Sequence, residues 1–500
     1  MEDKLRLLKE RLAEVNDLEN AVAVLDWDEQ TYMPPSGAAG RAEQMGTLSK
    51  LKHEKMSSDE MGQLLAEAEE QVKGLEPDSD DARLVRVAQH EHARRRQIPT
   101  PLAAELARTT AAAHTVWAKA RAEKDFRAFQ PSLEKIFDLK RQVANCFPAQ
   151  ESLYDPLLDE FEPGMKASQV REVFDRLKRD LQPLVRAIAA RPEINDAVLH
   201  QPYDEQKQWD FGLDVIGRFG FDFNRGRQDK TAHPFTTYFS QGDVRITTRV
   251  HPSFLNTALM GTLHECGHAL YDQGFDDKLA RSPLADGASH AIHESQSRLW
   301  ENLVGRSRGF WKFLYPRLQA TFPAQLQAVD LDTFYRAINK VKPSLIRVEA
   351  DEVTYNLHTM LRFELETDLL EGKLAVRDLP AAWNAKMRDY LDANVPDDGV
   401  GVLQDVHWSS GYIGYFPTYT LGNIASVQFF QQACRDVPSI PGDIERGEFR
   451  ALLAWLRDRV HRHGRKFTST ELLQRITGSP LTAEPYVTYL KQKYSEIYQL

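Results

Sequence analysis

Apolar residues recur every three to four positions along most of this 500-residue chain, and this period constrains the fold more than any other feature. Near the start of the chain the pattern consists of Leu5, Leu8, Leu12, Val15 and Leu18. Such spacing places the apolar side chains on one face of an α-helix, which is then buried against other helices. The same period runs through residues 41–73, 81–96, 101–126, 131–147, 167–190, 310–330, 352–371 and 445–460. We therefore expect an all-α, mainly helical fold.

Turn-forming residues separate these segments without dividing the chain into parts. Residues 33–37, 76–81 and 396–399 are rich in Pro, Gly, Asp and Ser. None of these stretches has the length of an interdomain linker, and we find neither an internal repeat nor a low-complexity tract. We expect a single domain that spans residues 1–500.

The overall charge and the cysteine content narrow the class of protein. Lys and Arg number 63 and Asp and Glu number 73, so the net charge of −10 offers no attraction to nucleic acid or to an anionic membrane. The three cysteines are an odd number and suggest a reducing compartment. The sequence contains neither a signal peptide nor a run of about 18 apolar residues that could span a bilayer. We expect a soluble cytoplasmic protein with no nucleic-acid or membrane partner.

A different pattern occupies residues 235–250, where β-branched and aromatic residues flank Gln241 and Gly242. This pattern predicts two short strands joined by a tight turn. Because an isolated hairpin is only marginally stable in water, we expect it to pack on the helical body.

Directly after this hairpin, residues 251–274 are predicted to form a helix that contains the sequence HECGH at positions 264–268. The i, i+4 spacing puts His264 and His268 on one face of the helix, where both imidazoles can bind one zinc ion. Glu265 lies beside the first ligand, so its carboxylate can reach the water that zinc activates without itself binding the metal.

A catalytic zinc needs a third protein ligand and an open position for water. The next helical segment, residues 289–305, contains His293 and Glu294 near its start. We predict Glu294 as the third ligand, with His290 and His293 as lesser candidates.

A second interpretation of these residues is a helical binding or scaffold protein with a structural zinc site. Structural sites have four protein ligands, commonly cysteines. Cys146 and Cys434 lie in no spaced cluster, and Cys266 lies on the helix face opposite the two histidines, where we expect a small buried residue. The residues themselves therefore favour a zinc hydrolase.

Further motifs surround these candidates. In chain order they are HPF at 233–235, DVRIT at 243–247, HECGH at 264–268, HESQ at 293–296, IRVEAD at 346–351 and GVLQDVHW at 401–408. On these motifs the chain resembles, over nearly its whole length, the M32 metallocarboxypeptidases of the thermostable carboxypeptidase 1 type. Residues 25–44 also look like the N-terminal region of this family.

The resemblance implies a gluzincin-type zinc peptidase with a deep substrate groove and a small hairpin near the active site. Residues 1–125 would cover the groove, and residues 230–425 would contain the metal and substrate site. It also implies one Zn²⁺ per subunit, with Co²⁺ or Mn²⁺ as alternative metals, and a homodimer. The implied activity is release of single amino acids from free C-termini of peptides, with broad preference and poor action next to proline.

Roles for further residues follow from these motifs and from the chemistry. Zinc and Glu265 would activate the water, and the oxyanion would need additional donors, for which His407 and Tyr415 are the first candidates and Tyr412 the next. Arginine suits the binding of a free carboxylate, and we favour Arg347 over Arg245.

Two remaining features concern substrate binding. The strand pair at 236–248 could bind the extended substrate backbone. His233 is a candidate substrate contact, although a loop histidine before proline needs no such role.

The alternative activity within hydrolases is a helical zinc oligopeptidase that cuts internal bonds of short peptides.

Overall fold

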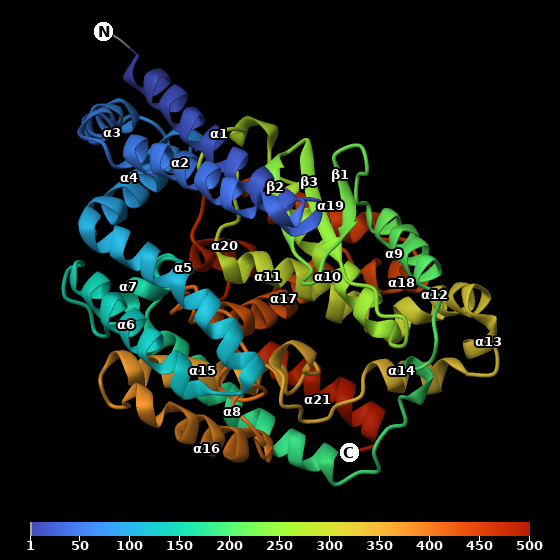
Figure 1. Cartoon of the computed structure of the whole chain (residues 1–500). Coiled ribbons are helices and arrows are strands. Elements are labelled where there is room, and N and C mark those ends of the chain that lie inside the picture. The colour runs from blue at the N-terminus through green and yellow to red at the C-terminus, as the bar shows by residue number, and fades with distance from the viewer. Residues whose placement is uncertain (1–2) are drawn as a thin grey trace.

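The computed structural model describes residues 3–500, and helices form most of it (Figure 1). The α-helices are α1 Lys4–Thr31, α2 Ala38–Ser57, α3 Asp59–Val72, α4 Asp80–Gln97, α5 Thr100–Glu123, α6 Phe126–Asn145, α7 Asp155–Leu158, α8 Ala167–Ala189, α9 Glu205–Phe219, α10 Leu255–Asp272, α11 His290–Arg298, α12 Arg308–Thr321, α13 Pro323–Leu326, α14 Leu331–Ile338, α15 Tyr355–Leu370, α16 Leu379–Leu391, α17 Pro417–Asp436, α18 Ile440–Glu445, α19 Arg450–Arg459, α20 Ser469–Thr477 and α21 Glu484–Tyr498. The predicted mainly helical fold is confirmed. Within residues 3–500, no helix is both long enough and apolar enough to cross a bilayer.

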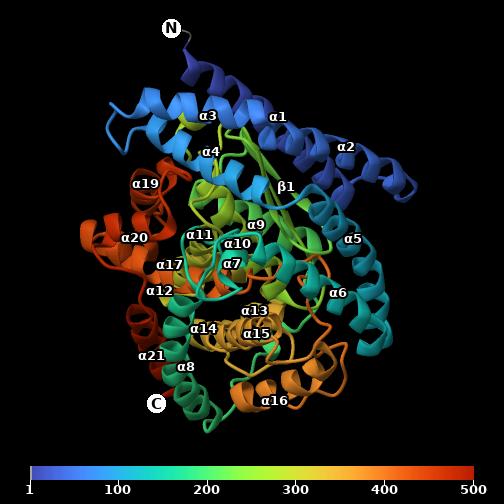
Figure 2. The same ribbon diagram turned by 90° about the vertical axis from the view of Figure 1, so that its left-hand side faces the viewer.

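Helices α1 to α4 form a layer at one end of the molecule, over the sheet (Figures 1 and 2). They share an apolar cluster that is separate from the main core and includes Leu12, Leu64 and Leu84. Leu279 and Leu284, from the segment after α10, complete this cluster. The layer is therefore a packed unit, and one segment of the body takes part in it.

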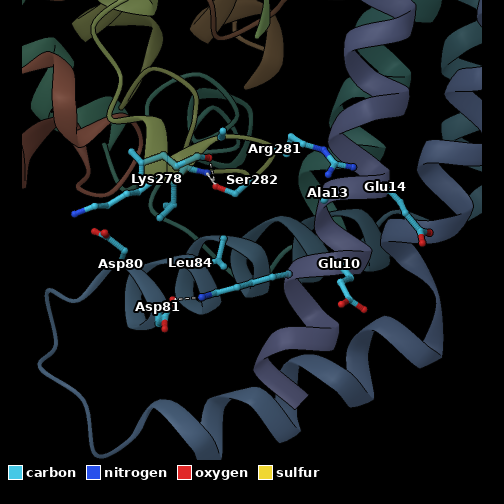
Figure 3. Close-up of a pocket in the computed structure, with 13 residues that line it drawn as sticks. Glu10, Ala13, Glu14, Asp80, Asp81, Leu84, Lys278, Arg281 and Ser282 are labelled. Atoms are coloured by element: carbon cyan, nitrogen blue, oxygen red, sulfur yellow. Dashed lines mark hydrogen bonds and ion pairs between the residues drawn. The ribbon is translucent and has the colours of Figure 1, made fainter. Parts of the chain in front are cut away.

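Charged side chains surround this cluster where the layer meets the body. A crevice of about 590 Å³ lies between α1, α4 and the segment that contains Lys278 and Arg281 (Figure 3). Arg281 pairs with Asp17 of α1 (2.5 Å), and Lys466 pairs with Asp80 at the start of α4 (2.7 Å). Ion pairs therefore supplement the apolar contact between layer and body.

The sheet has three strands, β1 Gly226–Lys230, β2 Thr236–Ser240 and β3 Asp243–Thr248. β3 is central, with β2 antiparallel and β1 parallel to it. The hairpin predicted for residues 235–250 is confirmed as β2 and β3. β1 was not predicted because its sequence, GRQDK, lacks the apolar alternation of a strand and pairs through its backbone.

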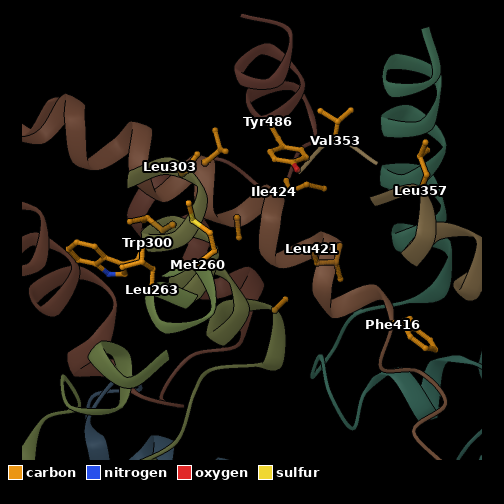
Figure 4. Packing of buried hydrophobic residues seen from close by; sticks show 14 of the residues in the cluster. Met260, Leu263, Trp300, Leu303, Val353, Leu357, Phe416, Leu421, Ile424 and Tyr486 are labelled. Carbon is orange, nitrogen blue, oxygen red and sulfur yellow. The ribbon is translucent and has the colours of Figure 1, made fainter. Parts of the chain in front are cut away.

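The centre of the body is a stack of α10, α11 and α17, with α11 in the middle (Figures 1 and 4). Two glycines allow these helices to approach closely. A Cβ at Gly267 of α10 would lie 2.5 Å from Cα of Ser297, and a Cβ at Gly422 of α17 would lie 2.7 Å from Cβ of Glu294. Figure 4 shows the apolar side chains around this stack, among them Leu263 and Leu421.

The segment predicted as one helix over residues 289–305 has two parts. α11 ends at Arg298 and continues as a π-helical turn, Leu299–Val304, in which the backbone N–H of Gly305 donates to the carbonyl of Trp300 (2.9 Å). Such widened turns are rare in proteins, and those that occur often lie at functional sites. This one contains Glu301.

Gly267 and Gly261 of α10 provide a matched test of the close helix contact. Gly267→Ala is expected to lower the free energy of unfolding by about 1–3 kcal/mol, because the new methyl group meets backbone atoms of α11. Gly261→Ala adds a methyl whose nearest neighbour is Oγ1 of Thr248 at 3.9 Å, and is expected to raise it by about 0.5–1 kcal/mol. Chemical denaturation followed by circular dichroism measures both. Equal stabilities would contradict the packing argument.

Candidate metal centre and active site

Two histidines of α10 and a glutamate of α11 bring three ligand atoms together. The Nε2 atoms of His264 and His268 lie 3.7 Å and 3.5 Å from Oε2 of Glu294. The two imidazole rings lie one helical turn apart, with centroids separated by 4.9 Å. One ligand atom from each of the three residues lies within 4.8 Å of the other two. The structure therefore gathers the three residues that the sequence predicts as metal ligands.

This donor set fits a divalent metal ion. Two imidazole nitrogens and one carboxylate oxygen suit such an ion when all three are deprotonated. Burial lowers the pKa of His268 to about 3, so this ring is neutral. Burial opposes the ionisation of Glu294, but Arg298 and the two histidines hold its pKa well below the usual range. Among the described residues the cluster has three ligands, fewer than the four of a structural zinc site.

Arg298 and Glu301 orient two of these ligands. Nε of Arg298 donates to Oε1 of Glu294 (2.6 Å), which leaves Oε2 facing the histidines. Nη1 of Arg298 donates to Glu301 (3.1 Å). Oε2 of Glu301 accepts from Nδ1–H of His264 (3.0 Å), so the Nε2 atom of this histidine is the one available to a metal.

His293, a lesser ligand candidate, supports His268 and lies outside the ligand group. Its Nδ1 lies 2.6 Å from Nδ1 of His268, and its Nε2 lies 3.0 Å from Oδ1 of the buried Asp272. A neutral His293 that donates to Asp272 accepts the Nδ1 proton of His268, which leaves Nε2 of His268 free for the metal. His290, the other lesser candidate, packs edge-on against Tyr415 with ring centroids 5.3 Å apart.

Glu265, the predicted general base, is buried beside the first ligand without joining the ligand group. The hydroxyl of Thr236 on β2 donates to Oε2 of Glu265 at 2.7 Å. Burial raises the pKa of Glu265, although the charge of His264 and the hydrogen bond from Thr236 act in the opposite direction. A carboxyl group with a raised pKa is better matched to proton transfer near neutral pH.

His407, Tyr412 and Tyr415 belong to one aromatic cluster. Nε2 of His407 lies 3.0 Å from the hydroxyl of Tyr419, and the rings of His407 and Tyr415 have centroids 5.5 Å apart. Burial, together with the charge of Glu294, raises the pKa of Tyr415, so its hydroxyl stays protonated. Tyr412 is 49% exposed and stacks on Tyr415 with centroids 6.0 Å apart.

Arg347 lies against the same aromatic cluster. Its Nε donates to Oδ1 of Asp405 (2.9 Å) and its Nη1 donates to the hydroxyl of Tyr355 (2.8 Å). The guanidinium lies 4.7 Å from the ring centroid of Tyr419. Tyr355 also contacts Arg298, whose guanidinium lies 4.5 Å from its ring centroid. This tyrosine therefore connects Arg347 with the metal centre.

Arg245 and His233 lie in different surroundings. Arg245 is on β3 and pairs with Asp243 at 2.7 Å. Its guanidinium lies 4.2 Å from a ring centroid of Trp27 on α1. Strand alternation puts it on the sheet face opposite Thr236, which contacts α10. His233 is exposed in the segment between β1 and β2.

Several residues of the site were not assigned from the sequence: Asp272, Arg298, Glu301, Tyr355 and Asp405. Spacing could have indicated one of them, because Asp272 follows His268 by four residues, which places both on one helix face. Glu301 lies in the π-helical turn, where the regular helical period does not apply. Tyr355 and Asp405 come from distant segments, so only the tertiary fold reveals their contacts.

Asp272→Asn is expected to weaken the binding of a divalent metal ion by about 10- to 100-fold, because the amide lacks the charge that supports His293 and, through it, His268. Competition with a chelator of known affinity measures the change in Kd. Asp277→Asn is the matched control, since this exposed aspartate lies just beyond the same helix. The same Kd for both variants would show that Asp272 does not support the site.

Comparisons with known proteins agree with this site. The family model described as carboxypeptidase Taq (M32) metallopeptidase matches residues 7–494. Thermostable carboxypeptidase 1 of Thermus thermophilus is 43% identical over 95% of each chain, and carboxypeptidase 1 of Bacillus subtilis is 39% identical over 98% of this chain and 97% of its own.

Solved structures show the same relationship. The M32 carboxypeptidase of Deinococcus radiodurans superposes with a TM-score of 0.97 at 43% identity, over 99% of this chain and all of that chain. A carboxypeptidase of Pyrococcus furiosus superposes with a TM-score of 0.95 at 35% identity over 99% of each chain. The chain therefore belongs to the M32 family of metallopeptidases and is a metal-dependent carboxypeptidase.

Proposed function

We propose that the protein is a zinc-dependent metallocarboxypeptidase that releases single amino acids from the C-termini of peptides with broad preference. One observation supports this proposal above the others. Three candidate metal ligands lie beside Glu265, a buried carboxylate that shares α10 with two of them, His264 and His268, but is not a ligand itself.

His264, His268 and Glu294 would hold the zinc ion. When bound, zinc supplies Lewis-acid chemistry, which acidifies a water molecule and polarises the scissile carbonyl. Glu265 then takes a proton from the water and delivers it to the leaving amine. Thr236 holds the carboxylate in place for both transfers through its hydrogen bond to Oε2.

Tyr415 and His407 would stabilise the negative charge that develops on the carbonyl oxygen. The raised pKa of Tyr415 keeps its hydroxyl available as a donor. Burial, and then the charge of Arg347, lower the pKa of His407 to about 3, so this imidazole is neutral. Tyr419 shares a hydrogen bond with His407 and thereby fixes the orientation of the ring.

Arg347 would bind the free α-carboxylate of the substrate. Its contacts with Asp405 and Tyr355 hold the guanidinium rigidly, so little side-chain freedom is lost on binding. Its Nη2 forms no hydrogen bond within residues 3–500, and a carboxylate could accept from it. Tyr412 and His233 stay predictions as substrate contacts.

Strand β2 would align the substrate backbone. It is an edge strand, and its Thr236 touches the general base. An extended peptide that adds to this edge uses its backbone N–H groups, which proline lacks. This accounts for the proposed poor action next to proline. The homodimer and the cytoplasmic location stay predictions.

Glu265→Gln is expected to lower kcat by about 10²- to 10⁴-fold while the protein retains its zinc, because the amide cannot accept the proton of the water. Turnover of a short peptide and the zinc content of the purified variant are measured together. Glu349→Gln, at an exposed position, is the control. Activity of Glu265→Gln equal to that of this control would rule out the general-base role.

Arg347→Ala is expected to lower kcat/KM on free-acid peptides by about 30-fold or more, equivalent to ~2 kcal/mol, because a charge-assisted contact is lost. Amidated peptides, which the wild type should leave intact, should stay intact. Arg245→Ala, the other candidate, should retain the wild-type kcat/KM on the free-acid peptides. Arg347→Lys, which keeps a charge next to Asp405, serves if the alanine variant is unstable. A loss confined to Arg245→Ala would transfer the role to that residue.

Mass spectrometry of peptides with free and amidated C-termini tests the activity itself. The zinc-loaded protein should shorten only the free-acid set, one residue at a time. Internal cuts in both sets would instead identify an oligopeptidase. Intact peptides in both sets would favour the structural-zinc alternative.

A further inference from the structure

Glu366, on α15, contacts both ends of the segment that separates His407 from Tyr415. Its Oε1 accepts from Nε1–H of Trp408 (2.8 Å), the residue after His407. Its Oε2 accepts from the backbone N–H of Gly414 (3.2 Å), the residue before Tyr415. A third donor, the hydroxyl of Tyr154, also reaches Oε2 (2.7 Å) and lies outside this segment.

The backbone of residues 407–415 is compact and depends on its glycines. The N–H of Tyr412 donates to the carbonyl of His407 (2.9 Å). Gly411 and Gly414 have φ values of +73° and +101°, which residues with a Cβ rarely adopt. A Cβ at Gly414 would also lie 2.7 Å from the carbonyl oxygen of Leu157. The segment therefore has one well-defined shape, and Glu366 binds it at both ends.

The buried carboxylate of Glu366 carries an energetic cost that a neutral side chain would avoid. It is fully buried and forms no ion pair within residues 3–500, because the nearby Arg362 is bonded to Asp405. Burial raises the pKa of Glu366 to about 7 against the effect of its three hydrogen bonds. A neutral glutamine would avoid this cost, but it has only one acceptor oxygen. Only a carboxylate accepts from both Trp408 and Gly414.

We propose that Glu366 is a positioning residue that holds His407 and Tyr415 in their relative orientation through Trp408 and Gly414. This inference rests on the proposed function, in which these two residues stabilise the developing oxyanion. Donors of this kind are effective only when they are held at a fixed position.

The test is Glu366→Gln. Whichever way the amide is turned, its NH₂ group faces an N–H donor of Trp408 or Gly414, so one end of the segment loses its anchor. We expect kcat to fall by about 10- to 100-fold, with KM within about twofold of wild type and an unchanged zinc Kd, since the segment contributes no metal ligand. A kcat within twofold of wild type, or an equal loss of zinc affinity, would overturn the proposal.

A double-mutant cycle with Tyr415→Phe distinguishes a positioning role from a general loss of stability. If Glu366 acts through Tyr415, Glu366→Gln should add little to the loss that Tyr415→Phe causes alone. Fully multiplicative losses would overturn the positioning role. If Tyr415→Phe itself leaves kcat unchanged, the donor role in the proposed function is wrong, and the inference about Glu366 is wrong with it.

Three further variants complete the experiment. Tyr154→Phe removes a hydrogen bond of the same carboxylate outside the segment, and Glu364→Gln alters a carboxylate that pairs with Lys178 and Lys386. Both should keep kcat within about threefold, and losses as large as that of Glu366→Gln would contradict the proposal. Trp408→Phe removes the indole N–H together with part of the buried ring, leaves Glu366 unchanged, and should lower kcat non-additively with Tyr415→Phe, even if Glu366→Gln does not fold.

Discussion

The charge balance around Arg298 is the interaction on which the metal centre depends. Glu294 and Glu301 are both buried, and an uncompensated buried carboxylate costs several kcal/mol. One guanidinium lies between them and binds an oxygen of each. Oε2 of Glu294 therefore stays directed at the Nε2 atoms of the two histidines, and Oε2 of Glu301 also accepts from Nδ1–H of His264. The same contacts that make the buried charges tolerable also orient the side chains that would hold the metal.

A similar arrangement stabilises Arg347. Asp405 accepts from Arg347 through Oδ1 and from Arg362 through Oδ2, so one carboxylate lies between two buried guanidinium groups. The two guanidinium groups and the single carboxylate leave one positive charge in excess. Arg347, which carries part of it, lies next to Tyr355 and Tyr419. A buried site with excess positive charge favours an anionic ligand, and a peptide C-terminus carries such a charge.

The sequence predicts most of what is local. The apolar period predicts the helical fold, and the i, i+4 spacing of His264 and His268 places them together on α10. Strand alternation could also have predicted the orientation of Arg245. This residue lies between the buried Val244 and Ile246, so its side chain must be on the opposite face of the sheet. Contacts such as those of Glu366 with Trp408 and Gly414 join distant segments through ordinary residue types. No local pattern distinguishes such a glutamate from the exposed ones.

The π-helical turn at Leu299–Val304 makes the metal centre depend on the number of residues between Glu294 and Glu301. A π-helical turn contains one residue more than an α-helical turn, and each residue of an α-helix corresponds to a rotation of about 100°. Deletion of a single residue between Glu294 and Glu301 would convert the turn to regular helix. It would also rotate one carboxylate away from its histidine, although every side chain of the site would still be present in the sequence. The spacing between these two glutamates is thus as much a part of the metal centre as the residues themselves.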